Sequence, residues 1–255
     1  MSVLHEIAVP LPGGGRLPAA LALPETLATG RAATPAAGVV VVHELLGLND
    51  DIRRIARRFA DAGYPTLAPD FLAGLGPKPI CIARFARGIG QVRSGAPYRR
   101  LDAARAWLAD HPAVGGGPIG VAGFCIGGGF VLVQAVGADV SVVAPFYAAV
   151  PKNAADLAGV CPVVASYGGR DRIFGAEGDR LDRALAGLGV DHDVKTYPDA
   201  GHAFMSPHGG LIGRIGPHLP SRNGYDPEAA EDAWRRTLAF FARHLRPSGA
   251  ARFDA

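Results

Sequence analysis

The run Gly38–Val42, with the sequence GVVVV, constrains the fold more than any other segment of the chain. It contains no polar residue, so a strand formed here would have to be buried on both faces. Strands of that kind occur in parallel sheets that are covered by helices on both sides. A helical pattern of apolar residues follows at once, from about Asp51 to Gly63. The segment therefore predicts an α/β fold.

The alternation of strand and helix continues along the rest of the chain. Before it, residues 5–9 and 16–23 read as two extended segments around a glycine-rich turn, which predicts an antiparallel hairpin. Further strands are expected at residues 65–70, 119–123, 140–144, 162–167 and 192–197, and helices at 51–63, 99–109, 124–136, 177–187 and 227–245. Helical turns are also expected near 82–85. We therefore expect a mostly parallel central sheet with helices on both faces and an N-terminal antiparallel hairpin.

Composition narrows the class of protein. A hydrophobic content of 49% in 255 residues excludes a disordered chain and suits one domain, which we place at residues 1–247, with a loose tail at 248–255. The net charge of +3, without a basic run carrying interleaved aromatic residues, argues against nucleic-acid binding. No apolar run approaches the roughly 18 residues of a membrane helix, and the N-terminus lacks a signal pattern. We expect a cytoplasmic protein that binds neither membranes nor nucleic acid.

The sharpest chemical feature is Gly123–Gly127, with the sequence GFCIG, between a predicted strand and a predicted helix. It has the shape of the nucleophile elbow, with Cys125 in the position usually held by serine. Glycine is needed two residues before and after the nucleophile because side chains there would collide with the strand or the helix. The N-terminus of the following helix would favour a thiolate. A buried cysteine at a tight turn is the alternative interpretation.

The order of later residues favours a catalytic role for Cys125. In this architecture an acid and then a histidine follow the nucleophile, each after a later strand. Asp171 follows the strand at 162–167, and His202 follows the strand at 192–197. An acid that orients a histidine, and a histidine that serves a thiol, form a triad for nucleophilic catalysis.

At this point the sequence resembles the dienelactone hydrolase family of the α/β-hydrolase superfamily. The matching segments are HELLGLN at 43–49, GFCIGG at 123–128, GGRD at 168–171, GHAF at 201–204 and DAWRRT at 232–237. The resemblance implies the α/β-hydrolase fold, with Cys125 as nucleophile, His202 as base and Asp171 as the acid that orients it. It adds Glu44, which in the family helps to form the thiolate. The backbone N–H groups of Ile126 and Leu45 are the expected oxyanion hole.

The likeness breaks where the family holds the carboxylate of its lactone substrate. An arginine is expected four residues after the catalytic histidine, and this chain has Ser206 there. A second arginine is expected within residues 78–100, where Arg84, Arg87 and Arg93 are the candidates. Arg214 and Arg222 are possible substitutes. We take Arg84, Arg87, Tyr147 and Phe204 as the predicted substrate-binding residues.

The resulting hypothesis is a cofactor-free hydrolase that cleaves a lactone or a small carboxylic ester through an acyl-enzyme. A general small-ester or thioester hydrolase is the first alternative, and a non-hydrolytic binding or group-transfer protein is the second. No metal site is expected, and the GxGxxG at 115–120 precedes a strand, which argues against a dinucleotide site. Cys81 and Cys161 lack a paired base and are expected to be passive thiols. The protein would act as a monomer or a small homo-oligomer.

Overall fold

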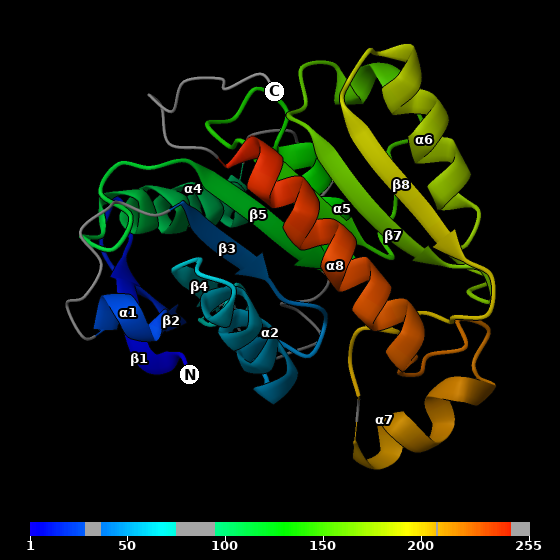
Figure 1. Ribbon diagram of the computed structural model, residues 1–255, viewed down its shortest axis with the longest axis horizontal. Helices are drawn as coiled ribbons and strands as arrows, with labels where there is room; N and C mark the ends of the chain where they lie inside the picture. The colour runs from blue at the N-terminus through cyan, green and yellow to red at the C-terminus, as the bar shows by residue number, and fades with distance from the viewer. Residues whose placement is uncertain (29–36, 75–94, 208, 246–255) are drawn as a thin grey trace.

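Eight strands in the described part of the chain form a single, mostly parallel sheet in the order β1-β2-β4-β3-β5-β6-β7-β8 (Figure 1). The structure is a computed structural model, and it describes residues 1–28, 37–74, 95–207 and 209–245. The strands are β1 (Val3–Pro10), β2 (Arg16–Leu23), β3 (Gly38–Val42), β4 (Thr66–Pro69), β5 (Ile119–Phe124), β6 (Val142–Phe146), β7 (Val163–Gly168) and β8 (His192–Tyr197). β2 pairs antiparallel with β1 and with β4, and the pairs from β4 to β8 are parallel.

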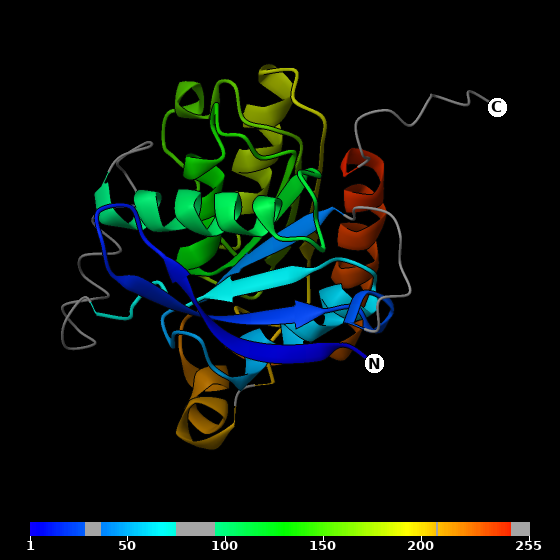
Figure 2. The same ribbon diagram turned by 90° about the vertical axis from the view of Figure 1, so that its left-hand side faces the viewer.

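Helices cover both faces of this sheet (Figure 2). α4 (Gly95–Asp110), α5 (Ile126–Gln134) and α6 (Glu177–Gly187) lie on one face, and α2 (Asp50–Asp61) and α8 (Pro227–His244) lie on the other. Among the described residues, shorter helices are α1 (Glu25–Ala28), α7 (Gly210–Ile215) and the 3-10 turns Ala154–Leu157 and Gly216–His218. Because β3 to β8 run parallel, their carboxyl ends lie along one edge of the sheet. Functional sites on such sheets are usually built at that edge.

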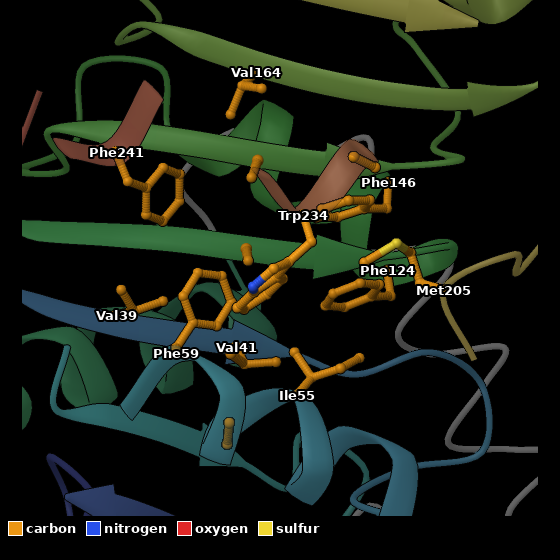
Figure 3. Close-up of a cluster of buried hydrophobic side chains, with 14 of the residues drawn as sticks. Val39, Val41, Ile55, Phe59, Phe124, Phe146, Val164, Met205, Trp234 and Phe241 are labelled. Carbon is orange, nitrogen blue, oxygen red and sulfur yellow. The ribbon is translucent and has the colours of Figure 1, made fainter. Parts of the chain in front are cut away.

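The GVVVV segment explains why the sheet needs two helical layers. Val39 and Val41 pack into one apolar cluster with α2 and α8, whereas Val40 and Val42 pack into another with α4, α5 and α6. In the first cluster Phe241 of α8 stacks on Phe59 of α2, and Trp234 of α8 packs edge-to-face against the same ring (Figure 3). All five residues of β3 are buried, as the absence of polar residues predicts.

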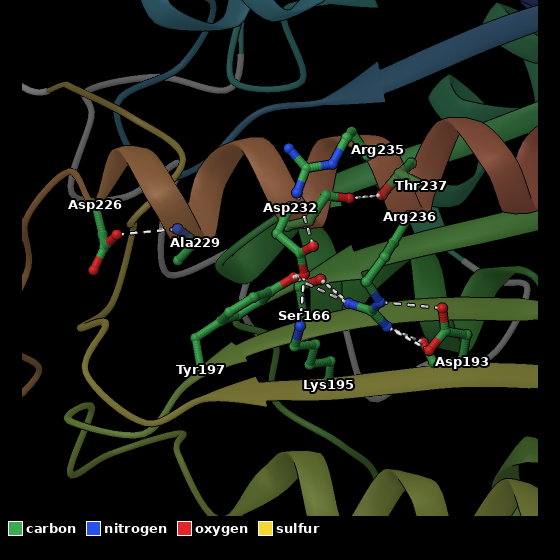
Figure 4. Close-up of polar contacts among 11 residues, drawn as sticks. Ser166, Asp193, Lys195, Tyr197, Asp226, Ala229, Asp232, Arg235, Arg236 and Thr237 are labelled. Carbon is green, nitrogen blue, oxygen red and sulfur yellow. Dashed lines mark hydrogen bonds and ion pairs between the residues drawn. The ribbon is translucent and has the colours of Figure 1, made fainter.

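A polar network anchors α8 across β7 and β8 (Figure 4). The Arg236 guanidinium donates to the Asp193 carboxylate and to Ser166 Oγ at 3.2 Å. Asp232 accepts from Tyr197 Oη at 2.9 Å and from Lys195 Nζ at 2.7 Å. These hydrogen bonds, above all those with Lys195 and Tyr197, lower the pKa of Asp232 to about 2. The network fixes the helix over the strands whose loops carry Asp171 and His202.

The sequence predictions for the fold are largely confirmed. The hairpin, the parallel sheet and the helices on both faces are present, and α2 begins at Asp50, one residue before the predicted start, after the cap formed by Asn49. β6 lies two residues later than predicted, and α7 was not predicted. The expected turns at 82–85 and the tail at 248–255 lie outside the described residues, and the division into one domain stays a prediction. Within the described chain, no helix is both long and apolar enough to span a bilayer.

Candidate active site

Cys125 occupies a strained turn between β5 and α5. Its backbone has φ 54° and ψ −118°, a conformation that residues with a side chain rarely adopt. Its N–H donates to the Phe146 carbonyl at 3.0 Å, which fixes the turn to the end of β6. The geometry is that of the nucleophile elbow, and it presents Sγ at the carboxyl edge of the sheet.

The two glycines of the elbow are required by close backbone contacts. A Cβ atom on Gly123 would lie 2.5 Å from the Gly127 carbonyl oxygen, and one on Gly127 would collide with the His43 carbonyl oxygen. The second contact also brings the loop after β3 against the start of α5. As a result, the segment that carries Glu44 lies beside the elbow.

Asp171 and His202 form a buried hydrogen-bonded pair. His202 Nδ1 lies 2.7 Å from Asp171 Oδ2, and the two side chains are 7% and 1% exposed. The other carboxylate oxygen, Oδ1, accepts from the N–H groups of Ile173 at 2.9 Å and Phe174 at 3.1 Å. Three donors thus hold the Asp171 carboxylate in place, and it directs Nε2 of His202 away from itself.

The other side of the His202 ring faces the Cys125 thiol. Burial favours the neutral ring, but hydrogen bonds with Asp171 and Cys125 outweigh it and raise the pKa of His202 to about 9. A pKa in this range means that the imidazole holds its proton at neutral pH when it faces a thiolate. The structure therefore brings Cys125, His202 and Asp171 together in the order that the sequence predicts.

Glu44 is buried in the loop after β3, and its position depends on His43. His43 Nε2 accepts from the Phe71 N–H at 2.9 Å, so Nδ1 carries the proton and donates to the Glu44 carbonyl at 2.7 Å. Burial raises the pKa of Tyr147 well above its usual value, and the charges of Glu44 and Cys125 raise it further. Glu44 and Cys125 therefore both lie close enough to Tyr147 to affect the same hydroxyl.

The two predicted oxyanion donors lie at the expected places in the chain. Ile126 is the first residue of α5, so its N–H has no acceptor within the helix and is available at the positive end of the helix dipole. Leu45 follows Glu44 and is 40% exposed. Whether the two N–H groups bind one oxyanion stays a prediction.

Of the predicted substrate-binding residues, Tyr147 and Phe204 are fully buried. The Tyr147 ring lies 4.9 Å from the His202 ring and 5.5 Å from that of Phe204, measured between centroids. Tyr147 packs against the histidine ring and Phe204 packs against Tyr147, whereas direct contact of either residue with a substrate stays a prediction. Ser206 is also buried. Arg84, Arg87 and Arg93 lie outside the described residues.

Backbone strain gathers around this site. Cys125, Tyr147, Ala203 and Arg222 are the non-glycine residues with positive φ in the described chain, at 54°, 41°, 55° and 51°. The first three follow β5, β6 and His202 directly. Strained residues of this kind persist where the surrounding structure fixes them, and they are common at functional sites.

Some supporting contacts were not predicted. The Phe174 ring lies 5.3 Å from the His202 ring, and the His202 N–H donates to the Ser221 carbonyl at 2.8 Å. Arg54 of α2 donates to the Met205 carbonyl at 2.8 Å. Tertiary contacts between distant loops carry no local motif. Of these contacts, only that of Phe174 could have been expected from the sequence, because Phe174 lies three residues after Asp171, the partner of His202.

Other potential sites are less developed. Burial raises the pKa of the Cys161 thiol to about 12, which suits a passive cysteine, and Cys81 lies outside the described residues. Among the described residues, no group of three His, Cys, Asp or Glu side chains is arranged to hold a metal ion.

Comparisons with known proteins all point to one family. The model of the dienelactone hydrolase family matches residues 23–245. A Methylorubrum extorquens protein, provisionally named a carboxymethylenebutenolidase, is 31% identical over 95% of this chain and 81% of its own. The carboxymethylenebutenolidase of Rhodococcus opacus is 29% identical over 81% of each chain. The crystal structure of a dienelactone hydrolase-like promiscuous phosphotriesterase from metagenomic libraries superposes with a TM-score of 0.79 at 26% identity, covering 96% of this chain and 99% of that one.

Proposed function

The chain belongs to the dienelactone hydrolase family, and from this premise we propose that it is a cysteine-dependent hydrolase of lactones or small carboxylic esters. One observation carries the proposal: Cys125 lies on a strained elbow facing His202, which the buried carboxylate of Asp171 orients at 2.7 Å. The nucleophile Cys125 contacts the base His202, and the base contacts the orienting acid Asp171, which is the chain of hydrogen bonds that nucleophilic catalysis requires.

The first half of the reaction forms an acyl-enzyme. The Cys125 thiolate attacks the carbonyl carbon, and the carbonyl oxygen becomes an oxyanion that accepts from the N–H groups of Ile126 and Leu45. The tetrahedral intermediate collapses with cleavage of the bond to the alkoxy oxygen. The leaving alkoxide takes a proton from the His202 imidazolium, and a thioester on Cys125 remains. With a lactone the leaving oxygen stays attached to the acyl group.

The second half releases the acid. Neutral His202 takes a proton from water while the water oxygen attacks the thioester carbon. The new oxyanion occupies the same two N–H groups and then collapses to break the carbon–sulfur bond. The product is a carboxylic acid, and Cys125 returns as a thiolate beside the His202 imidazolium.

We assign Glu44 to the formation of the first thiolate. Its carboxylate is buried with Tyr147 beside the elbow, within electrostatic range of the residues around Cys125. When substrate enters, the carboxylate accepts the thiol proton, and the thiolate is then stabilised by the protonated His202. The support for this step is that the charges of Glu44 and Cys125 both act on the Tyr147 hydroxyl, and that the His43 carbonyl lies against Gly127 of the elbow.

The substrate class follows from the polar groups around the site. Ser206 stands where the family holds a carboxylate with an arginine, and it is fully buried. A small neutral ester, lactone or thioester is therefore as suitable a substrate as a dienelactone. We expect the enzyme to act in the cytoplasm on a small molecule, without a cofactor, as a monomer or a small homo-oligomer. A non-hydrolytic role is disfavoured because all four catalytic candidates are retained.

A substrate panel tests this proposal. Purified protein is offered neutral lactones, carboxylate-bearing lactones, p-nitrophenyl esters and a thioester, alongside the variants Cys125→Ala and Cys161→Ala. We expect turnover of at least one ester or lactone, loss of that turnover in Cys125→Ala, and unchanged turnover in Cys161→Ala. Turnover that survives in Cys125→Ala, or none with any compound, refutes the proposal.

A further inference from the structure

A cavity lies beside the loops that carry Asp171 and His202. Its volume is about 740 Å³, and it is lined by residues 169, 170, 172, 199–201, 217, 218 and 222–226. Cys125, Glu44 and Tyr147 do not line it. The volume falls in the range of sites that hold small molecules, roughly 300–1,000 Å³. The cavity is thus separate from the place where acyl transfer is proposed.

Arginine dominates the chemistry of this cavity. Arg170, Arg172 and Arg222 line it, together with the carboxylates Asp199 and Asp226. Arg170 is paired with Asp199 at 2.7 Å. Asp226 caps α8, with its carboxylate accepting from the Ala229 N–H at 3.0 Å.

The other two guanidinium groups have no carboxylate partner among the described residues. Arg222 donates to the Pro217 carbonyl at 3.1 Å, and the Arg172 side chain forms no hydrogen bond or ion pair with any residue in the described part of the chain. Two guanidinium groups without acidic partners are therefore available on the wall of the cavity. Guanidinium forks bind phosphate and carboxylate groups through paired hydrogen bonds, so these two arginines suit an oxyanion.

The wall of the cavity is bonded directly to both triad loops. The Arg172 N–H, one residue after Asp171, donates to the Pro220 carbonyl at 3.2 Å. His202 is held from both sides, because its N–H donates to the Ser221 carbonyl and its carbonyl accepts from the Gly224 N–H at 3.2 Å. Arg222 lies between these two bonds with a strained φ of 51°. A ligand that binds Arg172 and Arg222 would therefore fix the segment against which His202 rests.

We propose that this cavity is a binding site for a small multivalent oxyanion, a compound bearing a phosphate or several carboxylates, held chiefly by Arg172 and Arg222. The bound anion bridges the loop after β7 and the 217–226 segment. It thereby tightens the support of the His202 backbone. This site does not depend on the proposed hydrolysis, because its residues take no part in the acyl-transfer steps.

Isothermal titration calorimetry with inorganic phosphate and with citrate tests the proposal, because the two probes separate a phosphate site from a polycarboxylate site. We expect one of them to bind saturably at one site per chain. Arg172→Gln and Arg222→Gln should each weaken that binding by at least about tenfold, the loss of one charge-assisted contact. The control Arg235→Gln removes an arginine that is 71% exposed on α8 and should change nothing. No saturable binding of either anion, or equal weakening in Arg235→Gln, overturns the proposal.

Hydrogen exchange provides an independent readout of the same site. Bound anion should slow amide exchange in residues 217–226, including the Gly224 N–H that bonds to His202. Exchange in β1 and β2, at the far edge of the sheet, should not change. Slowing that is spread evenly over the chain contradicts a local site. Because neither experiment measures hydrolysis, a negative result here leaves the proposed catalytic function untouched.

Discussion

Replacing Asp171 by asparagine should remove the hydrogen bond that orients the His202 ring and leave the packing around the ring unchanged. The asparagine side chain would keep the oxygen that accepts from the N–H groups of Ile173 and Phe174, so the turn after β7 remains intact. Its amide nitrogen would then replace Oδ2, which lies 2.7 Å from His202 Nδ1. Two N–H groups cannot bond to each other, so the ring would have to move its proton to Nε2. That tautomer cannot take a proton from Cys125 or from water.

The size of the effect follows from the buried ion pair. A hydrogen bond to a charged group is worth about 1.5–3 kcal/mol, and this one lies between side chains that are 1% and 7% exposed. At about 1.4 kcal/mol per factor of ten, the lost bond alone lowers the rate by roughly 10- to 150-fold. The wrong tautomer adds to this loss. We expect kcat/KM of Asp171→Asn to fall at least about 100-fold.

The assay is ester hydrolysis by the purified variant, with circular dichroism to show that it is folded. Asp199→Asn is the matched control, since this aspartate lies on the neighbouring loop, is 78% exposed and pairs with Arg170 at the surface. Its activity should stay within about twofold of the wild type, because exposed ion pairs contribute little. A folded Asp171→Asn enzyme with activity within about threefold of wild type would refute the orienting role of the carboxylate.

Three further predictions concern the thiols, the elbow and pH. Iodoacetamide should alkylate Cys125 well before Cys161, whose pKa is raised to about 12 by burial, and equal labelling by mass spectrometry would argue against an activated thiol. Gly127→Ala should lower the free energy of unfolding by about 1–3 kcal/mol in urea melts, whereas Gly187→Ala, at the end of α6 where a Cβ meets no atom within 4 Å, should leave it unchanged or raise it by up to about 1 kcal/mol. A Gly127→Ala protein as stable as wild type would refute the close packing of the elbow. The pKa of His202 is raised from 6.5 to about 9, so its proton contributes stability in full below about pH 6.5, and this contribution is lost as the pH rises through 9. The difference in unfolding free energy between wild type and His202→Gln should therefore shrink over that window, and a constant difference would contradict the raised pKa.

The fold was predictable because its strands carry strong local signals. The run at 38–42 contains only Gly and Val, and its burial on both faces requires helices on both sides of the sheet. The helix beginning at Asp50 has an Asn49 cap and apolar residues at helical spacing. Strand boundaries were harder to place. At β6 the predicted strand began two residues early, because no glycine or proline separates Val140 and Ser141 from the first strand residue, Val142.

The candidate triad was predictable because its members lie next to strand ends and glycines. A Cβ atom at either glycine of the elbow would collide with a backbone carbonyl oxygen, so the pattern records a steric requirement. The residues that hold His202 in place could not be predicted. Ser221 and Gly224 reach it through backbone bonds across the chain, and α7 comes from a segment without strong periodicity. Contacts made through main-chain atoms place no demand on residue type, and they therefore leave no motif.

If Cys125 is the nucleophile, an acyl-enzyme forms on its sulfur during turnover, and this intermediate can be trapped. Wild-type protein and Cys125→Ala are quenched in acid during steady-state hydrolysis of an ester found in the substrate panel, and intact mass is followed by peptide mapping. We expect a mass increase equal to the acyl group, located on the peptide that contains Cys125 and absent from Cys125→Ala. An acyl group located on another residue, or turnover by Cys125→Ala at the wild-type rate, would contradict this role of Cys125.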